Sequence, residues 1–339
     1  MASIAEALAL AKSAGLGVKG TTSPNPPVGA VLVSPNGEVV GVGGTQPVGE
    51  PHAEIMALRE AGPLAEGATA VVTLEPCSHT GRTGPCAVAL ADAGVASVVY
   101  LHPDPNPQAA GGGETLTARG IPARLASVEE RAAAASVEDA LLPWLAAIRM
   151  GRPHVTLKFA QTLDGLTAAV DGTSQWITGP YARAHVHADR TRRDAILIGT
   201  GTALADNPSL TARRADGSLY EAQPRRVVVG AGSLEGHAAH LEELGFEQYA
   251  SPSAALDALW EAGARDVLVE GGAGLASSFV QEGLVDAVRA YIAPTLLGAG
   301  RGVLAEPVAS TLADALAMRR TRVEELGADL VVDFTVERS

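Results

Sequence analysis

Four residues in the first third of the chain constrain its fold more than any other feature. His52 and Glu54 are separated by one alanine, and Cys77 and Cys86, the only cysteines in the sequence, follow after one expected helix and one expected strand. One imidazole and two thiolates are ligands of the kind that catalytic zinc prefers, and three protein ligands leave a fourth position for water. The sequence therefore predicts a fold that brings His52, Cys77 and Cys86 together around a zinc ion.

Glu54 is predicted to act on the metal-bound water and not on the metal. Two thiolates balance the charge of a dipositive ion, and the neutral centre still lowers the pKa of its water towards neutrality. A carboxylate beside that water can take its proton and return it. The signature of zinc nucleobase deaminases is H-x-E followed by P-C-x-x-C. Here eight residues and not two separate Cys77 from Cys86, so a loop containing Gly81, Gly84 and Pro85 lies between the thiolates.

Two other interpretations of the cysteines stay open at this point. They could form a disulfide, although nothing in the sequence indicates export to an oxidising compartment. They could also belong to a structural zinc site with a fourth protein ligand, for which His79 is the nearest candidate. That arrangement would leave Glu54 without a purpose, and we therefore favour the catalytic interpretation.

The bulk composition excludes several classes of protein. A chain of 339 residues with 47% hydrophobic content is long enough for two globular domains. The formal net charge of −13 argues against a nucleic-acid-binding surface, which ordinarily carries a basic face. The chain has neither a signal-like start nor a run of about 18 apolar residues. We expect a cytoplasmic protein with a small-molecule substrate, no membrane segment and no nucleic-acid partner.

The first half alternates helices and strands, which indicates an α/β fold with a largely parallel sheet. Asn25 lies among three prolines at the mouth of an expected strand, and Asp104 and Asn106 follow the end of another, where ligands of such sheets gather. Each could orient a ligand, or could only stabilise its loop. The expected elements are helices at 3–14, 52–61 and 86–94 and strands at 28–33, 38–43, 69–74 and 97–101.

An alanine-rich helix is expected from 128 to about 150, and the pattern begins afresh after Gly151-Arg152-Pro153. We therefore predict two domains, 1–148 and 152–339. In the second, the strands expected at 195–198 and 266–269 are each followed by a glycine-containing segment. Such turns expose backbone amides that can grip phosphate, and with the nearby arginine clusters they indicate a nucleotide cofactor.

Together these motifs resemble the bifunctional deaminase-reductases of riboflavin biosynthesis, the RibD or RibG family. The resemblance covers nearly the whole chain, and the widely spaced cysteine pair is its most specific element. The matching segments are Thr22 to Gly29, Pro51 to Glu54, Thr73 to Cys86, Asp104 to Pro107, Lys158 to Gly165, Ser174 to Thr178 and Glu270 to Gly272.

The resemblance implies an N-terminal cytidine-deaminase-like domain with three α/β/α layers and a C-terminal dihydrofolate-reductase-like α/β domain. The first would use Zn²⁺ to deaminate 2,5-diamino-6-ribosylamino-4(3H)-pyrimidinone 5′-phosphate. The second would use NADPH to reduce the ribosyl chain to ribityl, giving 5-amino-6-ribitylaminouracil 5′-phosphate. It also implies a homo-oligomer.

The resemblance further assigns residues to each site. In the deaminase, Glu54 is catalytic, and the substrate contacts are Asn25, His79, Arg82, Asp104 and Asn106. In the reductase, the substrate contacts are Lys158, Ser174, Arg190, Leu210, Arg213 and Glu270. The cofactor contacts are Ala160, Trp176, Thr202, Asp206, Gly272, Ala273, Gly274, Leu275, Ala276, Ser277 and Ser278.

Two departures from the family pattern stand out. Thr45 occupies a place where many relatives have a substrate-contacting histidine, and the segment 230–251 is short, with Ala231 in place of a common polar cofactor contact. One alternative is a zinc deaminase of another amino-heterocycle whose second domain binds a nucleotide without reducing anything. Another is a non-catalytic nucleotide-binding protein that zinc only stabilises.

Overall fold

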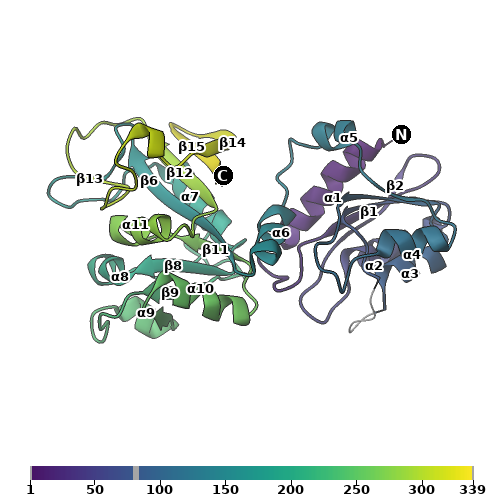
Figure 1. The fold of residues 1–339 in the computed structure, drawn as a ribbon, viewed down its shortest axis with the longest axis horizontal. Helices are drawn as coiled ribbons and strands as arrows, with labels where there is room; N and C mark the ends of the chain where they lie inside the picture. The colour runs from purple at the N-terminus through teal and green to yellow at the C-terminus, as the bar shows by residue number, and fades with distance from the viewer. Residues whose placement is uncertain (1, 79–83, 338–339) are drawn as a thin grey trace. The chain divides into compact units, whose positions relative to one another are not determined.

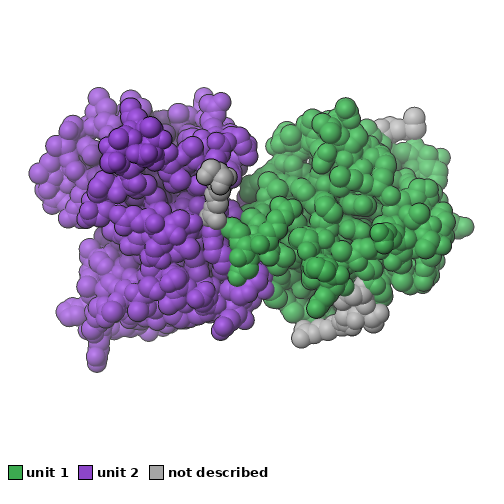
Figure 2. Space-filling view, viewed as in Figure 1, with its two compact units in different colours: residues 1–151 green, residues 152–339 purple. Residues whose placement is uncertain are grey.

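A computed structural model describes residues 2–78 and 84–337 of the chain. The chain divides into two compact units, unit 1 from Met1 to Gly151 and unit 2 from Arg152 to Ser339 (Figure 2). Each unit has its own sheet and its own hydrophobic core, and each is described separately. Within the described ranges, no helix combines the length and the apolar character that crossing a membrane would require.

Unit 1 contains a mixed five-stranded sheet of order β2-β1-β3-β4-β5 (Figure 1). β1 is antiparallel to both β2 and β3, whereas β3, β4 and β5 are mutually parallel. The largely parallel sheet predicted for this half is therefore only partly present, because β1 and β2 form a hairpin and the next helix returns the chain to the far side of β1. The strands are β1 Gly29–Val33, β2 Val39–Gly44, β3 Thr69–Leu74, β4 Ser97–His102 and β5 Ala123–Leu125.

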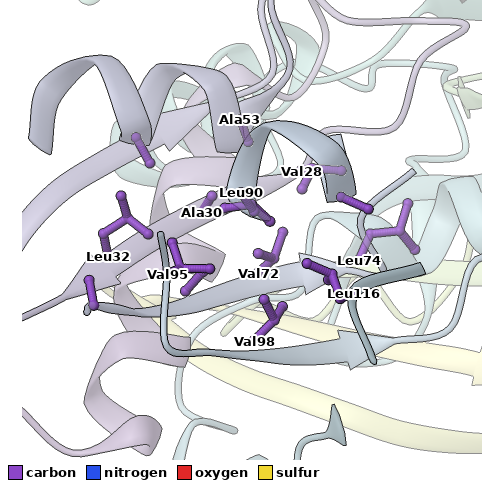
Figure 3. Close-up of a cluster of buried hydrophobic side chains, with 14 of the residues drawn as sticks. Val28, Ala30, Leu32, Ala53, Val72, Leu74, Leu90, Val95, Val98 and Leu116 are labelled. Atoms are coloured by element: carbon purple, nitrogen blue, oxygen red, sulfur yellow. The ribbon is translucent and has the colours of Figure 1, made fainter. Parts of the chain in front are cut away.

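Helices cover both faces of this sheet. One core cluster packs α1 against Val31 and Val71, and another packs residues of α2, α3, α4 and α6 against Ala30 and Val72 (Figure 3). Successive strand side chains point to opposite faces of the sheet, so Val31 and Val71 need a helix on one face, and Ala30 and Val72 need helices on the other. Full burial of a valine or leucine side chain contributes about 1.5–3 kcal/mol, which favours covering both faces. The helices are α1 Ile4–Val18, α2 Ala53–Ala61, α3 Cys86–Asp92, α4 Gly112–Ala118, α5 Val128–Ala133 and α6 Leu141–Met150.

The single helix expected from 128 to about 150 is wrong, because the chain breaks between α5 and α6. Pro143 explains the break. In a continuous helix its ring would clash with the carbonyl of the residue four positions earlier, whereas a helix that begins at Leu141 places it in the first turn. Asp139, one residue before the N-cap Ala140, also supports the new start, since its Oδ1 accepts a hydrogen bond from the Leu141 backbone N–H at 3.1 Å.

Unit 2 contains an eight-stranded sheet of order β10-β9-β8-β11-β6-β12-β15-β14. The strands from β10 to β12 in this order are parallel, and β15 and β14 add an antiparallel edge. They are β6 His154–Thr162, β8 Ala195–Gly199, β9 Arg225–Val229, β10 Glu247–Tyr249, β11 Asp266–Val269, β12 Ala287–Ala293, β14 Met318–Leu326 and β15 Asp329–Val336, and a separate pair joins β7 Leu166–Ala168 to β13 Arg301–Gly302.

The helices of unit 2 pack on both faces of its sheet. α10 and α11 contribute to one core cluster, and α8 and α9 to another that includes Ile196, Ile198 and Val228. α7 packs Ala182 against Tyr291 of β12. Both expected glycine-containing segments lead directly into helices. These helices are α7 Pro180–Arg190, α8 Thr200–Asp206, α9 Ala239–Leu244, α10 Pro252–Glu261 and α11 Ala273–Gln281.

A buried ionic network fixes the carboxyl end of α7 on the sheet. The Arg193 guanidinium donates to Asp189 at 3.0 Å and to Asp266 at 3.0 Å, and Arg289 contacts Asp189 at 2.7 Å and Asp333 at 2.7 Å. Burial alone would disfavour the charged Arg193, yet its two carboxylate partners raise its pKa. The network therefore holds the last turn of α7 in place, including Arg190.

Gly43 allows α2 to approach β2 closely. A Cβ atom at this position would lie 2.1 Å from the carbonyl oxygen of Ala53, in the first turn of α2. We expect Gly43→Ala to destabilise unit 1 by about 1–3 kcal/mol, since overpacking costs this much, and to speed amide hydrogen exchange in residues 53–61, measured by mass spectrometry. The matched control is Gly17→Ala, where the new Cβ would have no atom within 4 Å; equal exchange in both variants would contradict the steric argument.

Candidate active sites

Three elements of unit 1 bring the predicted metal ligands together. His52 is the N-cap of α2, Cys77 follows the end of β3, and Cys86 is the first residue of α3. One donor atom from each residue lies within 4.8 Å of the others. The His52 Nδ1 atom is 3.7 Å from Cys77 Sγ and 3.4 Å from Cys86 Sγ.

These distances fit a tetrahedral zinc ion. Zinc–nitrogen and zinc–sulfur bonds of about 2.0 and 2.3 Å at the tetrahedral angle place the donor atoms about 3.5 Å apart. The two measured nitrogen–sulfur separations lie on either side of this value. Cys77 and Cys86 are free cysteines, and no disulfide joins them. The donor set of one imidazole and two thiols therefore suits the ion in chemistry and in spacing.

The two thiols are electrostatically unequal. The Cys86 thiol and backbone N–H donate to the Cys77 sulfur, the backbone contact being 3.3 Å, and with His52 they lower the pKa of Cys77 to about 4. The same interaction, with burial, raises the pKa of Cys86. Cys77 is thus prepared as a thiolate, and a bound cation would remove the second proton as well.

Glu54 lies in the first turn of α2, two residues after the histidine ligand, and its side chain is only 4% exposed. Burial, together with the negative charge of Cys77, raises its pKa to about 7. A carboxyl group poised near neutrality can take up and release a proton at physiological pH. Glu54 is not a member of the metal-ligating group.

Glu75 joins the loop after β4 to the first turn of α4, next to this cluster. Its Oε1 accepts from the Gly113 N–H at 3.0 Å and its Oε2 from the Asp104 N–H at 3.4 Å. Ser78 adds a hydrogen bond from its hydroxyl to the Ala110 carbonyl at 2.5 Å. The segment that carries Cys77 is therefore fixed to the segment that carries Asp104.

The predicted substrate contacts of unit 1 have different surroundings. Asp104 and Asn106 are half-buried, and each accepts a hydrogen bond from a backbone N–H two residues later, so both at least stabilise their loop. Asn25 is half-buried in the loop before β1. Thr45 is 2% exposed, and its hydroxyl accepts from the Val28 N–H at 3.2 Å, so it supports the start of β1. His79 and Arg82 lie outside the described residues.

Unit 2 contains a cavity of about 490 Å³. Seven of the predicted reductase residues line it: Lys158, Ala160, Ser174, Trp176, Arg190, Asp206 and Arg213. The ionisable lining also includes Arg183 and Arg214, so five cations face one carboxylate. In a chain of net charge −13, this local excess of positive charge suits anionic ligands.

Glu270 lies behind this lining and binds two of the cations. The Arg190 guanidinium donates to Glu270 Oε1 at 2.7 Å and Oε2 at 3.0 Å, and Lys158 Nζ lies 3.4 Å from Oε2. Burial would raise the pKa of Glu270, but the charges of Arg190 and Lys158 outweigh it and hold the pKa at about 2. Glu270 is therefore an ionised carboxylate that aligns its two partners.

The remaining predicted reductase residues do not line the cavity. Leu210 has φ +48°, and its side chain is buried in the core. The Thr202 hydroxyl accepts from the Gly272 N–H at 3.0 Å and so joins α8 to the start of α11. The side chains of Leu275, Ala276 and Ser277 are buried, Ser278 lies one turn into α11, and the exposed part of this segment is Gly272 to Gly274, with Ala273 half-buried between the glycines.

Sequence reasoning missed several residues of the cavity. Arg183 and His187 were missed, although they precede the predicted Arg190 by seven and three residues on α7, a spacing that places all three on one helical face. That spacing could have been found in the sequence. Tyr291 could not, because it reaches the site only through the pairing of β12 with β6, where it lies opposite Ala160. The Arg183 guanidinium also stacks over the Trp176 ring at 4.7 Å.

The fold and the two sites define a class of α/β enzyme in which a deaminase-type zinc domain precedes a second domain with a cationic cavity. Residues 3–102 match the family described as the cytidine and deoxycytidylate deaminase zinc-binding region, and residues 153–332 match the RibD C-terminal domain. The chain belongs to the RibD family of riboflavin biosynthesis proteins. The predicted family and fold class are thereby confirmed. The deaminase region implies zinc as one cofactor, and the reductase domain implies NADPH as a second.

Relatives match over almost the full chain. The riboflavin biosynthesis protein RibD of Corynebacterium ammoniagenes is 60% identical over 318 residues, 93% of each chain. That of Mycobacterium tuberculosis is 46% identical over 98% of this chain and 97% of its own. The structure of Acinetobacter baumannii RibD, form 1, has a TM-score of 0.82 at 38% identity, covering 99% of this chain and 98% of that chain. A Thermotoga maritima diaminohydroxyphosphoribosylaminopyrimidine deaminase/5-amino-6-(5-phosphoribosylamino)uracil reductase has a TM-score of 0.81 at 32% identity, covering 97% and 96%.

The lowered pKa of Glu270 makes the stability of unit 2 dependent on pH. A carboxyl whose folded pKa is about 2 and whose unfolded value is 4.5 stabilises the fold above pH 4.5 and loses this contribution as the pH falls towards 2. We expect Glu270→Gln to cost about 3 kcal/mol at pH 7 and much less at low pH, measured by hydrogen exchange of β6 and β11 in urea. The exposed Glu221→Gln is the control; a deficit independent of pH would contradict the assignment.

Proposed function

We propose that this chain is a bifunctional enzyme of riboflavin biosynthesis. Unit 1 hydrolyses the 2-amino group of 2,5-diamino-6-ribosylamino-4(3H)-pyrimidinone 5′-phosphate. Unit 2 then reduces the ribosyl side chain with NADPH, giving 5-amino-6-ribitylaminouracil 5′-phosphate. The observation that carries the proposal is the three-donor cluster with a buried, near-neutral Glu54 beside it, in a chain whose second unit has a separate cationic cavity.

In the deaminase, His52 Nδ1 and the thiolates of Cys77 and Cys86 would hold the zinc ion. When bound, zinc lowers the pKa of a coordinated water and makes it a nucleophile. Glu54 would move the protons of the attacking water, one to the adjacent ring nitrogen and one to the departing amino group, so that ammonia leaves and a ring carbonyl remains. The proposed substrate contacts are Asn25, Asp104, Asn106, His79 and Arg82.

In the reductase, the protein positions two anionic ligands and stabilises charge. NADPH, when bound, supplies a hydride, and the acceptor is C1 of the ring-opened ribosyl chain. Arg190, Arg213 and Ser174 are proposed to bind the phosphorylated substrate, together with Lys158. Trp176 and Asp206, with Ala160, Thr202 and the segment 272–278, are proposed to bind the cofactor, whose phosphates suit the exposed backbone at the start of α11.

The geometry around Glu270 refines its role. Both of its carboxylate oxygens are engaged by Arg190, and one is also near Lys158. We therefore assign Glu270 as a positioning residue that acts through these two cations. Leu210, whose side chain is buried, is proposed to contact substrate through its backbone.

The cellular setting is part of the proposal. Two reduced cysteines that serve as metal ligands suit the cytoplasm. The acidic composition argues against nucleic acid as a partner. The RibD relationship is the basis for proposing a homo-oligomer.

The function is tested by supplying the diaminopyrimidine substrate with zinc and NADPH. We expect release of one ammonia and oxidation of one NADPH per substrate, and mass spectrometry should identify the ribitylaminouracil product. Ammonia release without NADPH oxidation by folded protein, even with supplied deaminated intermediate, would remove the reductase assignment. Absence of both activities in zinc-loaded protein would overturn the proposal as a whole.

Glu54→Gln should abolish proton transfer while it leaves the metal site intact. General acid–base catalysis contributes about 10²–10⁴-fold, so we expect ammonia release to fall by at least about a hundredfold, with an unchanged zinc content by elemental analysis. The matched control is Glu50→Gln, an exposed glutamate in the loop before His52, which should behave as wild type. Deamination that survives in Glu54→Gln would contradict its role.

Cys77→Ser should separate the two activities, because the zinc ligands all lie in unit 1. We expect loss of bound zinc and of deamination, with unchanged reduction of supplied deaminated intermediate. The reciprocal variant Lys158→Met should lose reduction but keep zinc and deamination. Loss of both activities in either variant would show that the sites do not act independently.

A further inference from the structure

We propose that His187 is a further substrate-binding residue of the reductase cavity, which contacts a phosphate monoester and binds a proton when that phosphate arrives. This inference rests on the proposed function of unit 2. Two ligands could bring the group: the substrate carries a 5′-phosphate, and NADPH carries a 2′-phosphate. We favour the substrate, because His187 lies between the two arginines proposed to bind it.

The position of His187 follows from α7. It lines the cavity one turn before Arg190, on the face that also presents Arg183. The backbone N–H of Arg213 lies 3.3 Å from its Nδ1 atom. An anion bound by Arg190 and Arg213 would therefore meet the imidazole as well.

The hydrogen bonds of the ring determine which nitrogen is available. His187 Nδ1 lies 3.1 Å from the carbonyl oxygen of Thr211. Both contacts of the ring use Nδ1, which either donates to this carbonyl or accepts from the Arg213 backbone N–H at 3.3 Å, so Nε2 is the nitrogen left for a ligand in either tautomer. Among the described residues no hydrogen-bond partner of Nε2 is found. The same carbonyl accepts from Arg190 at 2.8 Å, so one acceptor aligns the ring and the guanidinium side by side.

The surroundings keep this ring neutral in the absence of a ligand. Burial, then the charges of Arg190 and Arg213, lower the pKa of His187, and the hydrogen bond to the Thr211 carbonyl and the charge of Glu270 act in the opposite direction with smaller effect. The other ionisable groups that face the cavity from neighbouring elements are Lys158, Arg183, Asp206, Arg214 and Tyr291. A phosphate dianion would reverse the local sign of the potential, so the protonated ring would become the favoured form and would donate from Nε2.

Calorimetry of the full-length protein with ribose 5-phosphate tests the proposal directly. Titrations at about pH 7.5, above the second phosphate pKa of about 6, are run in two buffers with different ionisation enthalpies. We expect net proton uptake by the wild type, and an affinity that falls as the pH rises from about 6.5 to 8.5, because the bound form holds the extra proton. In His187→Gln the uptake should vanish and the affinity should fall about tenfold.

Controls separate the sources of the phosphate and the role of the residue. Ribose without phosphate should cause no uptake, and His237→Gln, an exposed histidine outside the cavity, should behave as wild type. Uptake with NADP⁺ but with neither NAD⁺ nor ribose 5-phosphate would assign His187 to the cofactor's phosphate. If the wild-type protein takes up no proton with either ribose 5-phosphate or NADP⁺, the proposal is overturned. This result needs no variant. NADPH oxidation is measured in parallel with the deaminated intermediate. Oxidation without proton uptake would overturn only the role of His187, whereas the absence of oxidation would overturn the reductase function itself.

Discussion

The convergence of one nitrogen and two sulfur atoms at the ends of three elements is the constraint on which unit 1 depends. His52 and Cys86 each stand at the start of a helix, and Cys77 follows the end of the central strand β3. A helix start offers partial positive charge and unpaired N–H groups, which favour thiolates. Because α2 begins at the histidine ligand, Glu54 is carried into the same buried region. The carboxylate proposed to be catalytic is therefore placed by the same helix start that places the histidine.

Unit 2 solves the opposite electrostatic problem. Its ligands are anions, whereas the chain as a whole is strongly acidic. Cationic side chains line the cavity, and the buried carboxylate of Glu270 holds two of them, Arg190 and Lys158, in a fixed geometry. A buried ion pair contributes little net stability compared with a well-packed apolar pair. Its value here is orientation, because the guanidinium and the ammonium are aligned before any ligand arrives.

Much of this arrangement could be predicted from the sequence, and the exceptions have identifiable causes. The strand-to-helix alternation was sufficient for an α/β class, and the particular fold of each domain came from the family resemblance. The hairpin of β1 and β2 follows from the turn at 35–37, but the antiparallel pairing of β1 with β3 was missed, because the sequence does not reveal that the chain crosses β1 after the hairpin. The break before α6 was missed although Pro143 signals it locally. Tyr291 was beyond sequence reasoning, because only the neighbouring register of β6 and β12 brings it beside Ala160.

The two sites also differ in how protons are handled, and this difference follows from burial. Glu54 is buried beside a thiolate, which raises its pKa to about 7 and suits it to exchange protons repeatedly in one turnover. Glu270 is equally enclosed, but two cations hold its pKa at about 2, so it stays ionised throughout. The same kind of side chain is thus suited to proton transfer in one unit and to a fixed charge in the other. The neighbouring charge decides between these roles, since desolvation acts on both carboxylates in the same direction.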